Sequence, residues 1–211
     1  MAKTPLIEDG LVVGTGSDKY DSKNPLAQYL LRQFDNSIAE LVKIAKPNTI
    51  LEVGCGEGHV TYILLANSEA TIQALDISQT IVDIAKAEID SPRVDFQQYN
   101  IYDLAEKEKA DLVVCCEVLE HLETPETGLL RLAEKAAPYA IISVPREPVW
   151  RMLNFVRGAH VKSFGNSPGH IQHWSQTAFI QFVEQQFDIV SVKAPLPWTI
   201  LLVKSKQFSD S

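Results

Sequence analysis

A glycine-rich turn is the part of this sequence best suited to hold a ligand. Residues 50–58 read Ile-Leu-Glu-Val-Gly-Cys-Gly-Glu-Gly, so an apolar stretch leads into three alternating glycines, Gly54, Gly56 and Gly58. Glycine lets the chain turn tightly and lets a ligand touch the backbone. The N-terminus of a following helix adds N–H groups that have no partner within the helix. The pattern predicts a nucleotide-type site where a strand passes into a helix.

Two acids near this turn indicate which ligand of that type it holds. Asp76 follows an apolar stretch, and a carboxylate at the end of the second strand can accept two hydrogen bonds from ribose hydroxyls. The alternative is that Asp76 caps the next helix. A dinucleotide-binding turn would place its third glycine one residue after Gly58, and a carboxylate at Glu52 would repel a pyrophosphate. A sulfonium with an α-amino group is cationic, so the electrostatics favour S-adenosylmethionine (SAM) over NAD.

A group of acids and a histidine follows a second apolar run at 110–116. His121 is the candidate general base, because imidazole side chains titrate near neutral pH and because this residue comes just after the fourth expected strand. The alternative is that His121 only orders the loop through hydrogen bonds to the backbone. Glu117 and Glu120 precede it at spacings that would place all three side chains on one face of a helix.

The same group permits a metal site as a second interpretation. Together with His170 or His173, the two glutamates and His121 would supply oxygen and nitrogen ligands for a divalent ion. His173 is also a candidate catalytic residue, although a single histidine more often has a structural role.

Residues 145–174 are the candidate substrate region, because long insertions after a core strand usually serve function. The arginines of this region could bind an anionic group of the substrate, or they could lie on a solvated helix face. The residues singled out for substrate contact are Trp150, Arg151, Asn154 and His170, with Arg146 and Arg157 nearby.

The elements that would position these residues alternate between strand and helix. Strands are expected at 49–53, 71–76, 94–99, 110–116 and 140–144, and helices at 25–45, 58–67, from 78, 124–137 and from 175. This alternation predicts an α/β fold with a parallel sheet covered on both faces, and the first strand is the expected switch point. Two further strands, 187–193 and 198–203, are expected to pair antiparallel at the sheet edge.

Composition narrows the class of protein. The chain has 211 residues, enough for a sizeable core, and a formal net charge of -8. An acidic surface repels phosphate backbones, so no nucleic-acid partner is expected. Cys55, Cys115 and Cys116 do not suggest a disulfide framework, and no apolar run is long enough to span a bilayer. We therefore expect a cytoplasmic protein without a membrane span, whose oligomeric state the sequence leaves open.

Residues 49–145 resemble class I SAM-dependent methyltransferases. The glycine turn matches the first motif of that family, Asp76 matches the acid that ends its second strand, and residues 110–122 match its fourth-strand motif. The string Glu-Val-Leu-Glu-His-Leu is most similar to that of small bacterial members that include ubiquinone-pathway O-methyltransferases. The resemblance implies a Rossmann-like sheet of seven strands, mostly parallel, with an antiparallel C-terminal hairpin.

The resemblance also assigns roles to individual residues. The glycine turn would contact the methionine part of SAM, Asp76 the ribose and Ile77 the adenine. Asn100 stands where the family often has an aspartate that bonds the adenine amino group, and an amide oxygen can still accept that bond. Tyr20 resembles a cofactor-covering N-terminal element. The full cofactor-binding set is Tyr20, Glu52, Gly54, Cys55, Gly56, Asp76, Ile77, Asn100, Ile101, Cys116 and Glu117.

The function implied is methyl transfer from SAM to an oxygen or nitrogen atom of a small molecule, which releases S-adenosylhomocysteine (SAH). No metal is expected, because metal-free family members carry nearly the same Glu-His string. The alternatives are a divalent-metal-dependent RNA 2′-O-methyltransferase and a SAM-binding protein without activity. We expect one domain over 1–211: an N-terminal helical cover (1–46), a SAM-binding core (47–144), a substrate-side insertion (145–174), and a C-terminal helix and hairpin (175–211).

Overall fold

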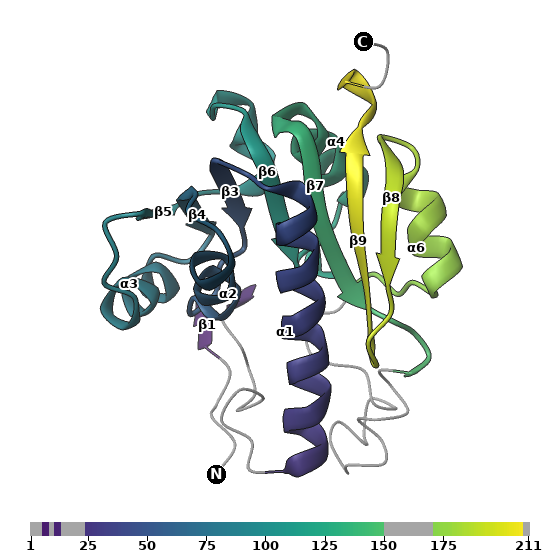
Figure 1. Ribbon diagram of the computed structural model, residues 1–211, viewed down its shortest axis with the longest axis horizontal. Coiled ribbons are helices and arrows are strands. Elements are labelled where there is room, and N and C mark those ends of the chain that lie inside the picture. Colours follow the sequence, from purple (N-terminus) through teal and green to yellow (C-terminus); the bar gives the residue numbers. More distant parts are fainter. Residues whose placement is uncertain (1–5, 9–10, 14–23, 150–170, 209–211) are drawn as a thin grey trace.

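The computed structural model describes residues 6–8, 11–13, 24–149 and 171–208, and its centre is a seven-stranded sheet in the order β5-β4-β3-β6-β7-β9-β8 (Figure 1). The strands are β3 (Thr49–Val53), β4 (Thr71–Asp76), β5 (Val94–Gln98), β6 (Ala110–Cys116), β7 (Ala136–Pro145), β8 (Phe187–Lys193) and β9 (Trp198–Ser205). Strands β3 to β7 are parallel, and β9 is antiparallel to both of its neighbours. The predicted sheet is therefore confirmed.

Helices cover both faces of the sheet. One layer contains α1 (Pro25–Ala45), α2 (His59–Asn67) and α3 (Gln79–Glu88), and the other contains α4 (Pro125–Lys135), α6 (Gln176–Val183) and the 3₁₀ turn η1 (Ile101–Glu106). The two cores alternate along β7, where Ile141 belongs to the first and Ile142 to the second, as the two-residue period of a strand requires. A separate ribbon pairs β1 (Leu6–Glu8) with β2 (Leu11–Val13).

Capping residues explain where most helices begin. Asn24 accepts a hydrogen bond from Leu26 N ahead of α1, and the Ser78 hydroxyl accepts from Ile81 N at the start of α3. Ser175 does the same for α6. Thr124, expected to cap α4, stands at the N-cap but makes no side-chain capping bond, so the proline that follows it at the first helical position is the remaining start signal.

The last core strand is longer than the sequence indicates. Strand β7 begins at Ala136 instead of 140, and α4 ends at Lys135 instead of about 137. Ala136 pairs with Ala110 of β6, so tertiary pairing with the neighbouring strand overrides the local helical pattern in these residues.

The switch point lies between β3 and β6. From β3 the chain proceeds to β4 and β5 on one side, whereas β6 and β7 lie on the other side. The expected switch at the first core strand is confirmed, and ligands of open α/β sheets bind at this place, beyond the carboxyl ends of the strands. Within residues 6–8, 11–13, 24–149 and 171–208, no helix combines the length and apolar character needed to cross a membrane.

Candidate active site

The glycine turn after β3 leaves one of its glycines open to a ligand. Gly54 and Cys55 donate their N–H groups to Leu75 O at 2.7 and 2.9 Å, which ties the turn to β4. A Cβ at Gly54 would lie 2.2 Å from Val118 Cγ2, so protein atoms fill that space, whereas a Cβ at Gly56 would meet nothing within 4 Å. With φ of 54°, Gly56 therefore presents bare backbone to open space, as a ligand cradle requires.

Asp76 connects this turn to the end of β4. One carboxylate oxygen accepts from Gly56 N and the other from Ser78 N, both at 3.0 Å. Burial raises the pKa of Asp76, and the backbone N–H donors oppose that rise. The helix cap of α3 is Ser78 and not Asp76, which removes the main alternative explanation for the acid. The Ile77 backbone is a third donor to this carboxylate, which can accept about four hydrogen bonds in all, so Asp76 retains capacity for a further donor.

Glu52 is buried beneath the turn. Its side chain is 2% exposed, one oxygen accepts the Thr61 hydroxyl at 2.7 Å, and the other has no partner among the described residues. Burial raises the pKa of Glu52 to about 8, and the nearby Asp76 adds to the rise. The acid is therefore mostly neutral at pH 7 in the ligand-free protein. The sequence argument that a negative charge at Glu52 selects a cation does not hold for this state.

Glu117 occupies the carboxyl end of β6, beside the glycine turn. It has φ of 60°, which is uncommon for a residue with a side chain and is a form of strain often found at functional sites. One carboxylate oxygen accepts from Trp198 Nε1 at 2.9 Å and the other from the Ser143 hydroxyl at 3.3 Å. No motif in the sequence pointed to Trp198 or Ser143. The sequence indicated only that both residues lie in expected strands, 140–144 and 198–203.

The alternative in which Glu117, Glu120 and His121 share one helix face does not match the structure. Leu119–His121 forms a single 3₁₀ turn, η2, and Glu117 lies before it, so the three residues do not belong to one helix. Glu120 is 1% exposed, and the His121 side chain is 40% exposed with Nε2 3.9 Å from Glu120 Oε1. Over the ranges that the structure describes, no three His, Cys, Asp or Glu side chains gather as metal ligands.

Residues 171–174 return to this turn and bring His173 to the same edge. Ile171 N and Gln172 N both donate to Glu120 O at 2.9 Å, and Glu147 N donates to the carbonyl of Trp174 at 2.9 Å. His173 Nδ1 lies 3.8 Å from Glu147 Oε1. The predicted substrate and cover residues lie outside the described ranges: Tyr20, Trp150, Arg151, Asn154, Arg157 and His170.

The remaining predicted cofactor residues differ in what they expose. Ile77 is 44% exposed just after β4, where an apolar surface can pack on a ring. Asn100 caps η1 through its side-chain oxygen, which accepts from Tyr102 N at 3.0 Å. Ile101 is buried in the core, so only its backbone is available. Burial raises the pKa of the Cys55 and Cys116 thiols, which argues against a nucleophilic thiolate at either position.

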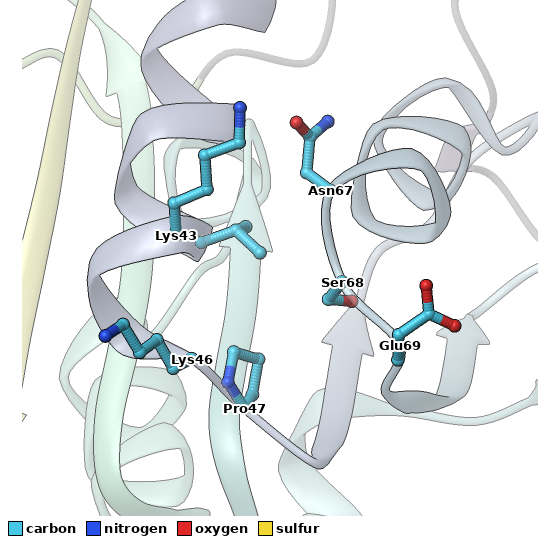
Figure 2. Close-up of a pocket in the computed structure, with 7 residues that line it drawn as sticks. Lys43, Lys46, Pro47, Asn67, Ser68 and Glu69 are labelled. Atoms are coloured by element: carbon cyan, nitrogen blue, oxygen red, sulfur yellow. The ribbon is translucent and has the colours of Figure 1, made fainter.

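A hollow of about 420 Å³ lies at the opposite end of the sheet and is not the site (Figure 2). It is formed where α1 and α2 end, at the amino ends of β3 and β4. Asn67 and Ser68 in its wall donate their side-chain hydrogen bonds to Ile63 O and Leu64 O of α2. These groups terminate a helix, and the residues that could do chemistry are at the carboxyl edge.

Comparison with known proteins finds a family match over the core of the sheet. Residues 50–137 match the model of the family described as "Methyltransferase domain". An uncharacterised protein of Synechococcus sp. is 39% identical over 101 residues, which are 45% of this chain and 24% of that protein. The ubiquinone biosynthesis O-methyltransferase of Rickettsia canadensis is 27% identical over 121 residues, 56% of this chain and 49% of that enzyme. This chain thus spans half or less of the length of these curated relatives.

The fold has close counterparts among solved structures. The crystal structure of magnesium protoporphyrin IX methyltransferase from Synechocystis, with bound SAH, superposes with a TM-score of 0.67. The match covers 90% of this chain and 94% of that one at 16% sequence identity. At this level of identity the similarity establishes the shared fold.

Proposed function

We propose that this chain, whose residues 50–137 match a methyltransferase-domain family, is a class I SAM-dependent methyltransferase that transfers the methyl group of SAM to an oxygen or nitrogen atom of a small-molecule acceptor. The observation that carries the proposal is the open cradle at Gly56, with the Asp76 carboxylate bonded to its N–H and the strained Glu117 at the next strand end. These three features meet at the switch point of the sheet, where such folds bind their ligands.

The residues present fit SAM. The backbone of the turn would hold the methionine part, the remaining acceptor capacity of the Asp76 carboxylate would bind the ribose, and the exposed Ile77 would pack on the adenine. Bound SAM supplies an activated methyl group on its sulfonium. A bound cation would also favour ionisation of Glu52 and so lower its pKa from about 8.

The protein has two tasks on the acceptor side, to align the acceptor atom with the methyl group and to remove a proton where the acceptor carries one. His121 is the proposed base, because it is partly exposed next to the switch point and has the buried Glu120 beside it. His173, near Glu147, is the second candidate. The main chain places residues 171–172 against the His121 turn, and this supports the 145–174 segment as the acceptor side.

Titration calorimetry with SAM, SAH and NAD tests the cofactor. We expect binding of SAM and SAH, and binding of NAD alone would overturn the proposal. Release of SAH across a panel of phenols, carboxylates and amines tests the reaction, with Gly56→Val as the control because its side chain would fill the cradle. Chelator-sensitive methylation of RNA would favour the RNA alternative. SAM binding without turnover on any acceptor would favour a non-catalytic protein.

A further inference from the structure

The indole of Trp198 reaches Glu117 from a strand that is not adjacent to it. Trp198 begins β9, Glu117 follows β6, and β7 lies between them. Neighbouring strands are about 4.8 Å apart, so the side chain crosses roughly 10 Å of the sheet edge. Its Nε1–H donates to Glu117 Oε2 at 2.9 Å. Glu117, a residue of the proposed cofactor site, is thus bound by a side chain that belongs to none of the sequence motifs of that site.

Both ends of this contact are tightly constrained. Trp198 is 6% exposed, and its ring packs on Phe34 of α1 with ring centroids 5.0 Å apart. At the other end, Glu117 N donates to Ser143 O at 3.0 Å, and the Ser143 hydroxyl donates to the second carboxylate oxygen. A glutamate side chain loses considerable rotamer freedom when it is ordered. These contacts supply the donors that compensate for that loss.

The chain after Glu117 is in direct contact with the glycine turn. Val118 Cγ2 is the atom that a Cβ on Gly54 would strike at 2.2 Å, so no gap separates the two loops. A carboxylate fixed at this place is complementary to the cationic amino and sulfonium groups of SAM. A donor that fixes the carboxylate before the ligand arrives reduces the ordering needed on binding.

We propose that Trp198 is a positioning residue for the cofactor. Its indole N–H sets the orientation of the Glu117 carboxylate, and Phe34 of α1 holds the indole in place. This inference rests on the proposed function. It extends the site from the switch point between β3 and β6 to β9, which contributes Trp198, and to α1, which contributes Phe34. Helix α1 lies across one face of the sheet (Figure 1).

Trp198→Phe tests the role, because it keeps an aromatic ring against Phe34 and removes the N–H donor. We expect SAM affinity to fall about tenfold, the lower end of what a hydrogen bond to a charged group contributes. Thr199→Val is the matched control. Thr199 is the next residue on β9, fully buried, with a hydroxyl that has no partner in the described part of the chain. This variant should bind SAM like the wild type.

The indole resonance of Trp198 in nitrogen-labelled wild-type protein, assigned from its through-space contact with the Phe34 ring, gives a second readout. In Glu117→Gln we expect this resonance to shift, because its acceptor loses its charge. An unchanged resonance would overturn the inference even if Trp198→Phe does not fold. SAM affinity of Trp198→Phe within twofold of the wild type would overturn it as well. If the wild type binds no SAM, the proposed function fails, whereas the indole resonance still reports on the contact.

Discussion

At alkaline pH, the Glu52→Gln variant should have a higher unfolding free energy than the wild type. Glu52 is fully enclosed, and burial raises its pKa from 4.5 to about 8. The folded protein therefore holds this proton more tightly than the unfolded chain does, so the unfolding free energy falls as pH rises from about 4.5 and the loss is complete above about pH 8. Glutamine has nearly the same volume, can still accept the Thr61 hydroxyl and cannot ionise.

The expected size of the effect follows from the shift. One pKa unit corresponds to about 1.4 kcal/mol, so Glu52 alone should lower the unfolding free energy of the wild type by about 4 kcal/mol between pH 5 and pH 9. This value is an upper limit, because water that enters around the ionised acid reduces the penalty. The contributions of groups that are not coupled to Glu52 are shared by both proteins and cancel in the difference.

Urea unfolding followed by circular dichroism at several pH values measures this difference. The gap between the unfolding free energies of variant and wild type should widen from about pH 5 and level off above about pH 8. Glu88→Gln, which alters an exposed acid on α3, should give curves parallel to the wild type. If the Glu52→Gln and wild-type curves stay within about 1 kcal/mol of parallel over this range, the reasoning from burial is refuted.

Three further outcomes are expected. Asp76→Ala should weaken SAM binding by about 1.5–3 kcal/mol in calorimetry, the range for hydrogen bonds to charged groups, and unchanged affinity would remove Asp76 from the cofactor site. His121→Ala should lower kcat far more than SAM affinity and should abolish one limb of the pH–rate profile; a wild-type profile would leave His121 a structural role. Gly58→Ala should destabilise the fold by about 1–3 kcal/mol, because φ is 93° and the new Cβ would lie 2.7 Å from Ile89 Cδ1. An additional Ile89→Ala should relieve the steric part, and an unchanged melting temperature of Gly58→Ala would contradict the argument.

The sequence predicted those parts of the fold that local patterns specify. The buried strand β6 and the cap at Ser78 follow from apolar runs and capping chemistry, which act over a few residues. The start of β7 at Ala136 could not be predicted from local patterns, because it depends on pairing with Ala110 of β6. The conditional grouping of Glu117, Glu120 and His121 on one helix face also depends on more than local spacing, because Val118 packs on Gly54 and Leu119–His121 forms a single 3₁₀ turn.

The candidate site shows the same division between local and long-range information. The glycine turn and Asp76 are recognisable because a ligand in this geometry demands those residue types. Trp198 reaches Glu117 across 81 positions of sequence, and such a contact becomes visible only once the strand order is known. Burial, which a sequence does not display, raises the pKa of Glu52 and so weakens the sequence argument from its charge in the ligand-free state.

The attachment of residues 171–172 to the turn after β6 has a consequence for how this protein can diverge. Both bonds run from main-chain N–H groups to the main-chain carbonyl of Glu120, so they require no particular side chain at 171 or 172. Any residue except proline can keep these two bonds. Position 171 can therefore change while the main chain keeps its register on the turn. Gln172 also donates from its side-chain Nε2 to Leu122 O at 3.1 Å, so a substitution there loses a third bond. The main chain thus carries most of the attachment, and one side chain adds to it.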